Sequence, residues 1–161
     1  MSGRVFVDTN VLVYAHDTST GVKHEKAAAL VERLWQERTG AISTQVLQEL
    51  YVSLRRKAGR PLASEEARAV VADYLRWEVV VNNGESILDA VALEQRYGIS
   101  FWDALVVQAS RACGAEILYS EDPVQGHDGD RGRAQAAARE DLLILMGGES
   151  GAGREQGTVE E

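Results

Sequence analysis

Short apolar runs alternate along the chain with longer segments in which apolar residues recur every three or four positions. Two or three consecutive apolar residues between polar segments are typical of strands that are covered on both faces of a sheet. Such runs occur at residues 5–7, 41–42, 79–81 and 117–119. They predict four buried strands.

The longer segments predict amphipathic helices. In the first of them, apolar residues starting at Ala27 follow the spacing i, i+3, i+4, i+7, i+8, which places them on one helix face. Gly98 and Gly114 directly follow two of the segments, where helices often end in a left-handed residue. The predicted helices cover residues 23–37, 44–57, 64–77, 85–97 and 101–113.

The alternation of strands and helices favours one α/β domain, with helices on both faces of a central parallel sheet. Residues 127–146 form an atypical end, which begins with a stretch rich in glycine and charge. Within this end, residues 134–139 are compatible with a short helix and residues 142–146 with a fifth strand. We therefore expect a sheet of four to five strands within residues 1–146 and a disordered tail over 147–161.

Composition bears on which macromolecules the protein can bind and on the cellular compartment in which it is expected. The formal net charge of -8, from 17 basic and 25 acidic residues, argues against a broad basic surface for duplex DNA. Cys113 is the one cysteine, so no internal disulfide is possible and a reducing, cytoplasmic location is expected. No segment approaches the roughly 20 apolar residues of a membrane span, so no membrane association is expected.

Acidic residues occur where the predicted strands end. Asp8 directly follows the first strand, and Glu121 and Asp122 follow the strand over 117–119. Glu49 lies early in the helix that follows the second strand. Asp103 lies in the first turn of the helix that precedes the strand over 117–119. Because the carboxyl ends of parallel strands share one sheet edge, these acids are expected to converge there.

Each acid also has a local explanation. Asp103 completes a Ser100-x-x-Asp103 pattern that resembles a capping box, and Asp122 precedes a proline in an ordinary turn sequence. Glu49 fits a solvated helix carboxylate, and Asp8 fits a local cap. The arrival of all of them at one sheet edge favours a shared site over separate local roles.

Converging carboxylates have a specific chemistry. Carboxylates held within about 5 Å of one another share protons or bind cations. Oxygen ligands suit Mg²⁺ or Mn²⁺, and the scattered His16, His24 and His127 offer no cluster for zinc. The reaction indicated is metal-assisted hydrolysis of a phosphodiester, in which the cation activates a water and stabilises the developing charge.

Four sequence blocks in order resemble the PIN domain family and, more narrowly, the VapC-type toxins of bacterial toxin–antitoxin pairs. The resemblance covers residues 4–126. The blocks are Asp-Thr-Asn-Val-Leu at 8–12, Ser-Thr-Gln-Val-Leu-Gln-Glu at 43–49, Phe-Trp-Asp-Ala-Leu at 101–105 and Ser-Glu-Asp at 120–122.

This resemblance implies a PIN-like three-layer α/β/α fold and assigns roles to individual residues. The family's acidic positions, catalytic and metal-binding, match Asp8, Glu49, Asp103 and Asp122. Its supporting polar positions match Thr9, Asn10 and Thr44, which would orient carboxylates or bind metal-bound water.

The resemblance further implies an endoribonuclease that depends on Mg²⁺ or Mn²⁺, forms a homodimer, and is inhibited by a cognate antitoxin in its active-site groove. Arg55, Arg56 and Lys57 form a candidate surface for RNA or a partner, with a solvated helix end as the alternative. After residue 126 the chain departs from relatives, which continue into a last strand ending near Asn-Pro-Phe.

Two other functions compete with the nuclease. A phosphatase with Asp8 as nucleophile is disfavoured, because position 10 is Asn rather than Asp and residues 77–95 contain no lysine for phosphate. A catalytically inactive PIN-like protein-interaction module stays open as the alternative, because the end of the chain is altered.

Overall fold

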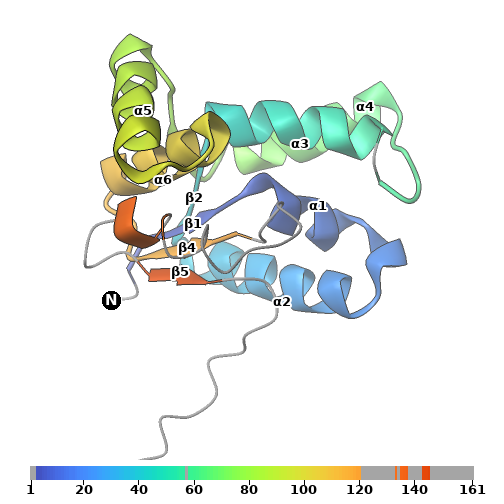
Figure 1. Cartoon of the computed structure of the whole chain (residues 1–161). Coiled ribbons are helices and arrows are strands. Elements are labelled where there is room, and N and C mark those ends of the chain that lie inside the picture. Colours follow the sequence, from blue (N-terminus) through green and yellow to red (C-terminus); the bar gives the residue numbers. More distant parts are fainter. Residues whose placement is uncertain (1–2, 57, 121–132, 134, 138–142, 146–161) are drawn as a thin grey trace, which may run out of the picture.

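The computed structural model describes residues 3–56, 58–120, 133, 135–137 and 143–145. Within these residues, five strands form a sheet in the order β3-β2-β1-β4-β5 (Figure 1). Every neighbouring pair is parallel. The strands are Val5–Val7 (β1), Gly40–Ser43 (β2), Glu78–Val80 (β3), Ile117–Tyr119 (β4) and Leu143–Leu145 (β5).

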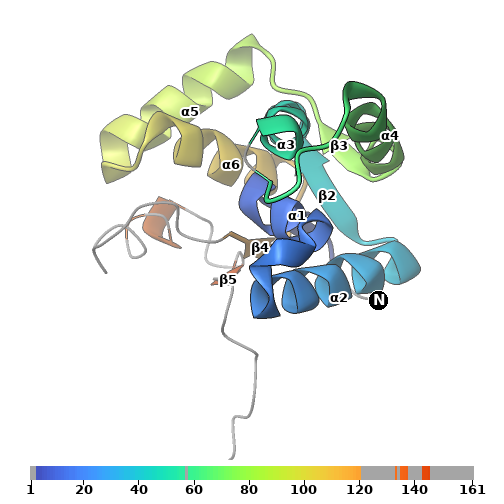
Figure 2. The ribbon, with the colours of Figure 1, turned by 90° about the vertical axis from the view of Figure 1, so that its right-hand side faces the viewer.

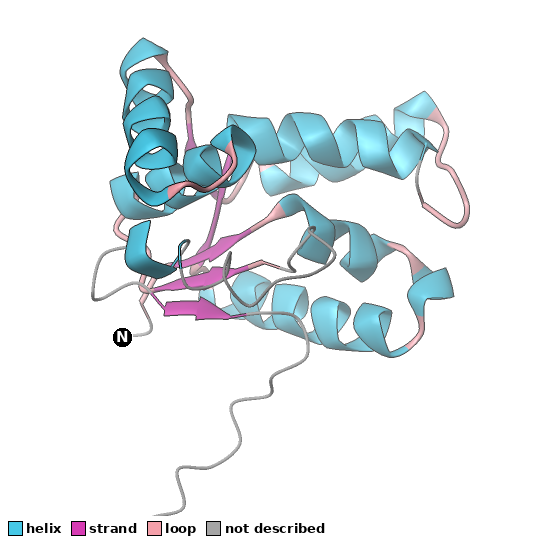
Figure 3. Ribbon diagram, in the orientation of Figure 1, coloured by secondary structure: helices cyan, strands magenta, loops and turns pink. Residues whose placement is uncertain are grey.

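Helices cover both faces of the sheet, with α2 on one side and α6 on the other (Figures 1 and 3). Figure 2 shows α5 lying along α6, and α3 lying beside α4. This arrangement confirms the predicted three-layer α/β/α class. The helices are Thr9–His16 (α1), Val22–Glu37 (α2), Thr44–Arg56 (α3), Ser64–Tyr74 (α4), Gly84–Tyr97 (α5) and Phe101–Ala112 (α6), with a 3₁₀ turn at Thr18–Thr20 (η1).

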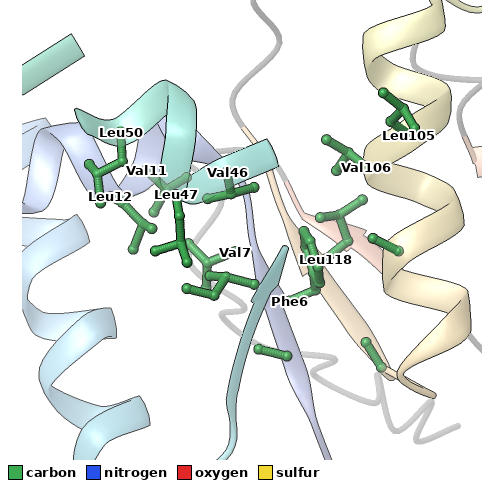
Figure 4. Close-up of a cluster of buried hydrophobic side chains, with 14 of the residues drawn as sticks. Phe6, Val7, Val11, Leu12, Val46, Leu47, Leu50, Leu105, Val106 and Leu118 are labelled. Atoms are coloured by element: carbon green, nitrogen blue, oxygen red, sulfur yellow. The ribbon is translucent and has the colours of Figure 1, made fainter. Parts of the chain in front are cut away.

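The core lies between the sheet and these helices. Leu105 and Val106 of α6 point toward Phe6 and Leu118 of the central strands (Figure 4). Phe6 is fully buried and Leu118 is 2% exposed. Burying side chains of this size stabilises a fold by roughly 1.5–3 kcal/mol each. The central strands are therefore firmly held, and so is the position of the residue that follows each of them.

The structure confirms the four predicted strands and the fifth, which pairs in parallel with β4. Residues 135–137 are helical, within the predicted short helix. Helix α1 was not predicted, and the helix expected over 64–77 ends at Tyr74, so that the chain can turn into β3. The predicted disordered tail, residues 147–161, lies outside the described residues.

The carboxyl edge of the sheet is built from abrupt junctions. Asp8 separates β1 from α1, and Thr44 begins α3 directly after β2. The hydroxyl of Ser43, which is fully buried, accepts a hydrogen bond from the Val46 backbone N–H at 3.2 Å and so caps α3. Ser120 follows β4, whose last residue Tyr119 is in register with Val7. Polar side chains from three neighbouring strands therefore meet at one edge.

Candidate active site

Asp8 lies at the centre of this edge, 8% exposed. As the N-cap of α1, its Oδ1 accepts a hydrogen bond from the Thr9 N–H at 2.7 Å. Its Oδ2 accepts a hydrogen bond from the Ser120 hydroxyl at 2.8 Å. Both carboxylate oxygens are thus fixed by groups from two neighbouring strand ends, which sets the orientation of the carboxyl group.

The surroundings of Asp8 disfavour its negative charge. Burial raises the pKa of this carboxyl from 3.8 to about 6, although the hydrogen bonds from Ser120 and Thr9 lower it. The negative charges of Glu49 and Asp103 raise it further. The three acids are therefore electrostatically coupled, and a cation beside Asp8 would favour its ionised form.

Glu49 is held by two donors. The Thr9 hydroxyl donates to its Oε2 at 2.8 Å, and the Gln45 amide donates to its Oε1 at 3.0 Å. Gln45 precedes Glu49 by one helical turn of α3, so the two side chains share a face of the helix. Thr9 is the first residue of α1, directly after Asp8. Its hydrogen bond to Glu49 therefore connects the start of α1 to α3.

Asp103 lies in the first turn of α6. Its backbone N–H donates to the Ser100 hydroxyl at 3.1 Å, which is the helix cap that the sequence pattern indicated. The local role and a place at the site are compatible, because Asp103 also borders the cleft that Asp8 and Glu49 border.

A cleft of about 570 Å³ opens between α1, α3 and α6. Its walls combine carboxylates, amides and apolar side chains, including an indole that is 62% exposed. The lining residues are Asp8, Thr9, Asn10, Gln45, Gln48, Glu49, Val52, Ser53, Trp102, Asp103 and Val106.

The described acids surround this cleft without closing into a compact group. Within the described part of the chain, no three His, Cys, Asp or Glu side chains lie close enough together to hold a metal ion. Protein donors contact both oxygens of Glu49. The donor chemistry nevertheless fits Mg²⁺ or Mn²⁺, since the cleft offers carboxylate oxygens and a buried acid whose charge needs a counter-ion.

Some residues singled out in the sequence lie elsewhere. Thr44 faces Asn82 after β3: its hydroxyl donates to the Asn82 Oδ1 and accepts from the Asn82 N–H, each at 3.1 Å. Arg55 and Arg56 are exposed at the end of α3, with the Arg55 guanidinium 5.8 Å from the centre of the Tyr51 ring. Asp122 and Lys57 lie outside the described residues.

Sequence reasoning overlooked several residues of the site. Ser120 was quoted only as part of a motif, and its bond to Asp8 joins residues 112 apart in the chain. The i, i+4 spacing of Gln45 and Glu49 on a predicted helix could have indicated their contact. Nothing in the local pattern distinguished Trp102 from an ordinary apolar residue of an amphipathic helix.

Comparison with known proteins identifies the family. The sequence profile described as PIN domain matches residues 5–127. A search of curated proteins finds no match. No helix in the described part of the chain is both long and apolar enough to span a membrane.

Solved structures share the fold. The sarcin-ricin-loop-cleaving toxin VapC20 of Mycobacterium tuberculosis matches with a TM-score of 0.59 and 24% identity, over 80% of this chain and 94% of that one. A toxin–antitoxin complex from Klebsiella pneumoniae gives 0.55 and 19%, over 78% and 93%. VapBC2 from Rickettsia felis, bound to a promoter DNA fragment, gives 0.55 and 19%, over 88% and 97%. The chain belongs to the PIN domain family.

Proposed function

We propose that this chain is an endoribonuclease that depends on Mg²⁺ or Mn²⁺, and that it is the toxin of a toxin–antitoxin pair. The observation that carries the proposal is the position of Asp8, Glu49 and Asp103 around one cleft in a PIN domain. Structural neighbours that are toxins, one of which cleaves the sarcin-ricin loop, support this proposal.

The cation would be held by the carboxylates that border the cleft, Asp8, Glu49 and Asp103, together with Asp122. A bound Mg²⁺ or Mn²⁺ would supply a water of lowered pKa and would stabilise the charge that develops on the scissile phosphate. Asp8 is the principal ligand in this proposal, because it is buried at the sheet edge and two donors fix its orientation.

The residues around these acids keep them in position. Thr9 and Gln45 hold the two oxygens of Glu49, and Ser120 holds one oxygen of Asp8. Partners of this kind orient metal ligands, and losing one commonly lowers metal affinity 10- to 100-fold. Asn10 lines the cleft and offers an amide to metal-bound water or to RNA.

An antitoxin would inhibit the enzyme by occupying the cleft. Carboxylates around an opening of this size complement a basic side chain of such a partner. Two of the structural neighbours come from toxin–antitoxin assemblies. We further propose that the toxin is a homodimer in the cytoplasm, which light scattering of the purified chain and cell fractionation would test.

The cationic end of α3 is a proposed contact for RNA phosphates. Arg55 and Arg56 are exposed there, and Lys57 continues the run. Because phosphate contacts release counter-ions, replacing Arg55 and Arg56 with Ala should weaken RNA binding and reduce its salt dependence. Binding that is unchanged across salt concentrations would leave these residues as a solvated helix end.

The decisive experiment measures RNA cleavage by the purified full-length chain, with Mg²⁺, with Mn²⁺ and with EDTA. Cleavage should require the cation and should be lost in Asp8→Asn. Asp89→Asn, on α5 and away from the cleft, is the matched control for removing one carboxylate. Absence of cleavage and of metal binding would favour the inactive interaction module instead.

Expression in bacteria tests the toxin assignment separately. The chain should arrest growth when it is expressed alone, and co-expression of its gene neighbour should relieve the arrest. Mapping the ends of cleaved RNA from these cells would identify the target. Unaffected growth, with wild-type protein present and folded, would contradict a toxin.

A further inference from the structure

Trp102 is a large aromatic side chain left exposed at the cleft. It is 62% exposed, although its neighbours on α6 from Ala104 to Val107 are buried. It lines the same cleft as Asp8, Glu49 and Asp103. We propose that Trp102 is a stacking platform for a nucleobase of the bound RNA; this rests on the proposed ribonuclease function.

The described residues that line the cleft include no positively charged side chain, and the proposed contact of Arg55 and Arg56 with phosphates lies outside it. The cleft is lined by three carboxylates, and the whole chain carries a formal charge of -8, so phosphates are repelled from this region. A bound cation would offset part of that repulsion. The face of a base is uncharged, and its stacking on an aromatic ring contributes about 1–3 kcal/mol per base with little sequence preference. Trp102 is placed to supply this attraction.

The indole has one aromatic neighbour and stays largely exposed. The Phe101 ring packs against Trp102 with ring centroids 5.3 Å apart and an interplanar angle of 66°. Val52 of α3, which is 44% exposed, contributes a second apolar side chain to the same cleft, and Gln48 contributes an amide. A flat apolar group with polar edges matches this combination, and a nucleobase has that chemistry.

A base can stack on Trp102 only where it is not stacked within a duplex. In a duplex each base face is covered by its neighbours, so an internal base must be unstacked before a protein ring can replace them. A base stacked on Trp102 would lie in the cleft that Asp103 also lines. The scissile phosphate of a bound single strand would then lie close to the carboxylates that hold the cation.

The test uses the full-length chain carrying Asp8→Asn, which should slow cleavage enough for binding to be measured, with poly(U) as the single-stranded probe and poly(A)·poly(U) as the duplex. Poly(U) should quench the tryptophan fluorescence, and Trp102→Phe should remove this quenching while it keeps most of the affinity. Trp102→Ala should weaken poly(U) binding about 5- to 150-fold. Leu88→Ala is the matched control, because Leu88 on α5 is a large apolar residue that is 70% exposed and does not line the cleft; this variant should bind as the parent does.

Three results would overturn the platform: no binding of poly(U) by the parent, equal affinity in Trp102→Ala, or equal dependence on Trp102 for the duplex. Thermal melting of each variant separates these from unfolding, and Trp102→Phe covers the case in which Ala destabilises α6. Metal-dependent cleavage with Trp102→Ala as active as wild type would leave the nuclease intact and remove only the platform. If the wild type bound poly(U) through Trp102 but cleaved no RNA, the platform would stand and the proposed nuclease would be refuted.

Discussion

Helix α1 begins at one buried aspartate and ends at another, and the two carboxyl groups are in opposite situations. Asp8 and Asp17 are each 8% exposed. Asp17 accepts hydrogen bonds from the Ser19 N–H and hydroxyl, at 3.1 and 2.6 Å, and from the Gly59 N–H at 3.0 Å. These bonds, with the Ser19 hydroxyl first, hold the pKa of Asp17 below its usual value.

Asp8 shows the opposite balance. The effect of burial exceeds that of its two donors, and Glu49 and Asp103 add to it. Asp17 is therefore a satisfied structural acid that ties η1 to the connection after α3, whereas the charge of Asp8 is not compensated by the protein. The exposed fraction of the side chain therefore does not distinguish these two carboxylates, whereas the desolvation of Asp8 and the donors around Asp17 do.

The Asp17 contact also depends on a glycine. A Cβ at position 59 would collide with the Ser19 side chain, which itself donates to Asp17. The chain thus brings two backbone N–H groups and a hydroxyl to this carboxylate through close approach. Asp8, in contrast, borders the cleft.

The largest expected effect separates the two aspartates by activity. Asp8→Asn should lower the RNA cleavage rate by about 10²- to 10³-fold, since charge stabilisation by a bound cation is worth several kcal/mol. Asp17→Asn should leave the rate per folded molecule unchanged and lower the thermal midpoint. Single-turnover cleavage, normalised by the folded fraction from circular dichroism, checks both. Equal losses of activity in the two variants would contradict the distinction.

The second effect concerns stability without metal. The folded-state pKa of Asp8, about 6, exceeds the ordinary value of 3.8, so the folded protein binds the extra proton between these pH values. The resulting stabilisation is fully present below about pH 4 and is lost as the pH rises through 6. At pH 7.5 the cost is about 3 kcal/mol, at 1.36 kcal/mol per pKa unit.

Urea unfolding in EDTA measures this cost. Asp8→Asn should be more stable than wild type by about 2–3 kcal/mol at pH 7.5 and nearly equal to it at pH 4. The amide keeps the bond from Thr9, and the Ser120 hydroxyl can reverse its role to accept from the new donor. Adding Mg²⁺ should stabilise only the wild type. A difference between the two proteins that does not vary with pH would refute the charge argument.

The sequence predicts the position of Asp8 at the end of a strand, but it does not predict the pKa of its carboxyl group. An apolar run that ends in an acid indicates a buried carboxyl group at a strand end, because the rest of the strand must be covered. Its donor Ser120 comes from a different strand, and that pairing becomes visible only when β1 and β4 lie side by side. A pKa depends on such long-range partners.

The missed helix has a similar cause. Helix α1 is short, and residues 11–15 are consecutively apolar, so they do not show the spacing of an amphipathic helix. Thr44 illustrates a different limit. The sequence places it correctly after β2, but a hydroxyl can bond in several directions, and the structure turns it to Asn82. Side-chain direction depends on the neighbouring strand, which the local pattern does not contain.

The smallest expected effect compares the serines that serve the two aspartates. Ser120→Ala removes a donor that lowers the pKa of Asp8, so the ionised form becomes less favourable and Mn²⁺ affinity should fall by about 10-fold. Ser19→Ala removes the corresponding donor to Asp17, so the protein should lose stability while its Mn²⁺ affinity is unchanged.

Calorimetric titration with Mn²⁺ and urea unfolding of both variants complete the comparison. Each substitution deletes one hydroxyl that donates to one buried carboxylate, at 2.8 Å in one case and 2.6 Å in the other. The two differ only in what the carboxylate faces: a cleft with further acids, or the donors of a closed turn. If Ser19→Ala weakened Mn²⁺ binding as much as Ser120→Ala does, the loss would reflect general loosening of α1, and Asp8 would have no special place in metal binding.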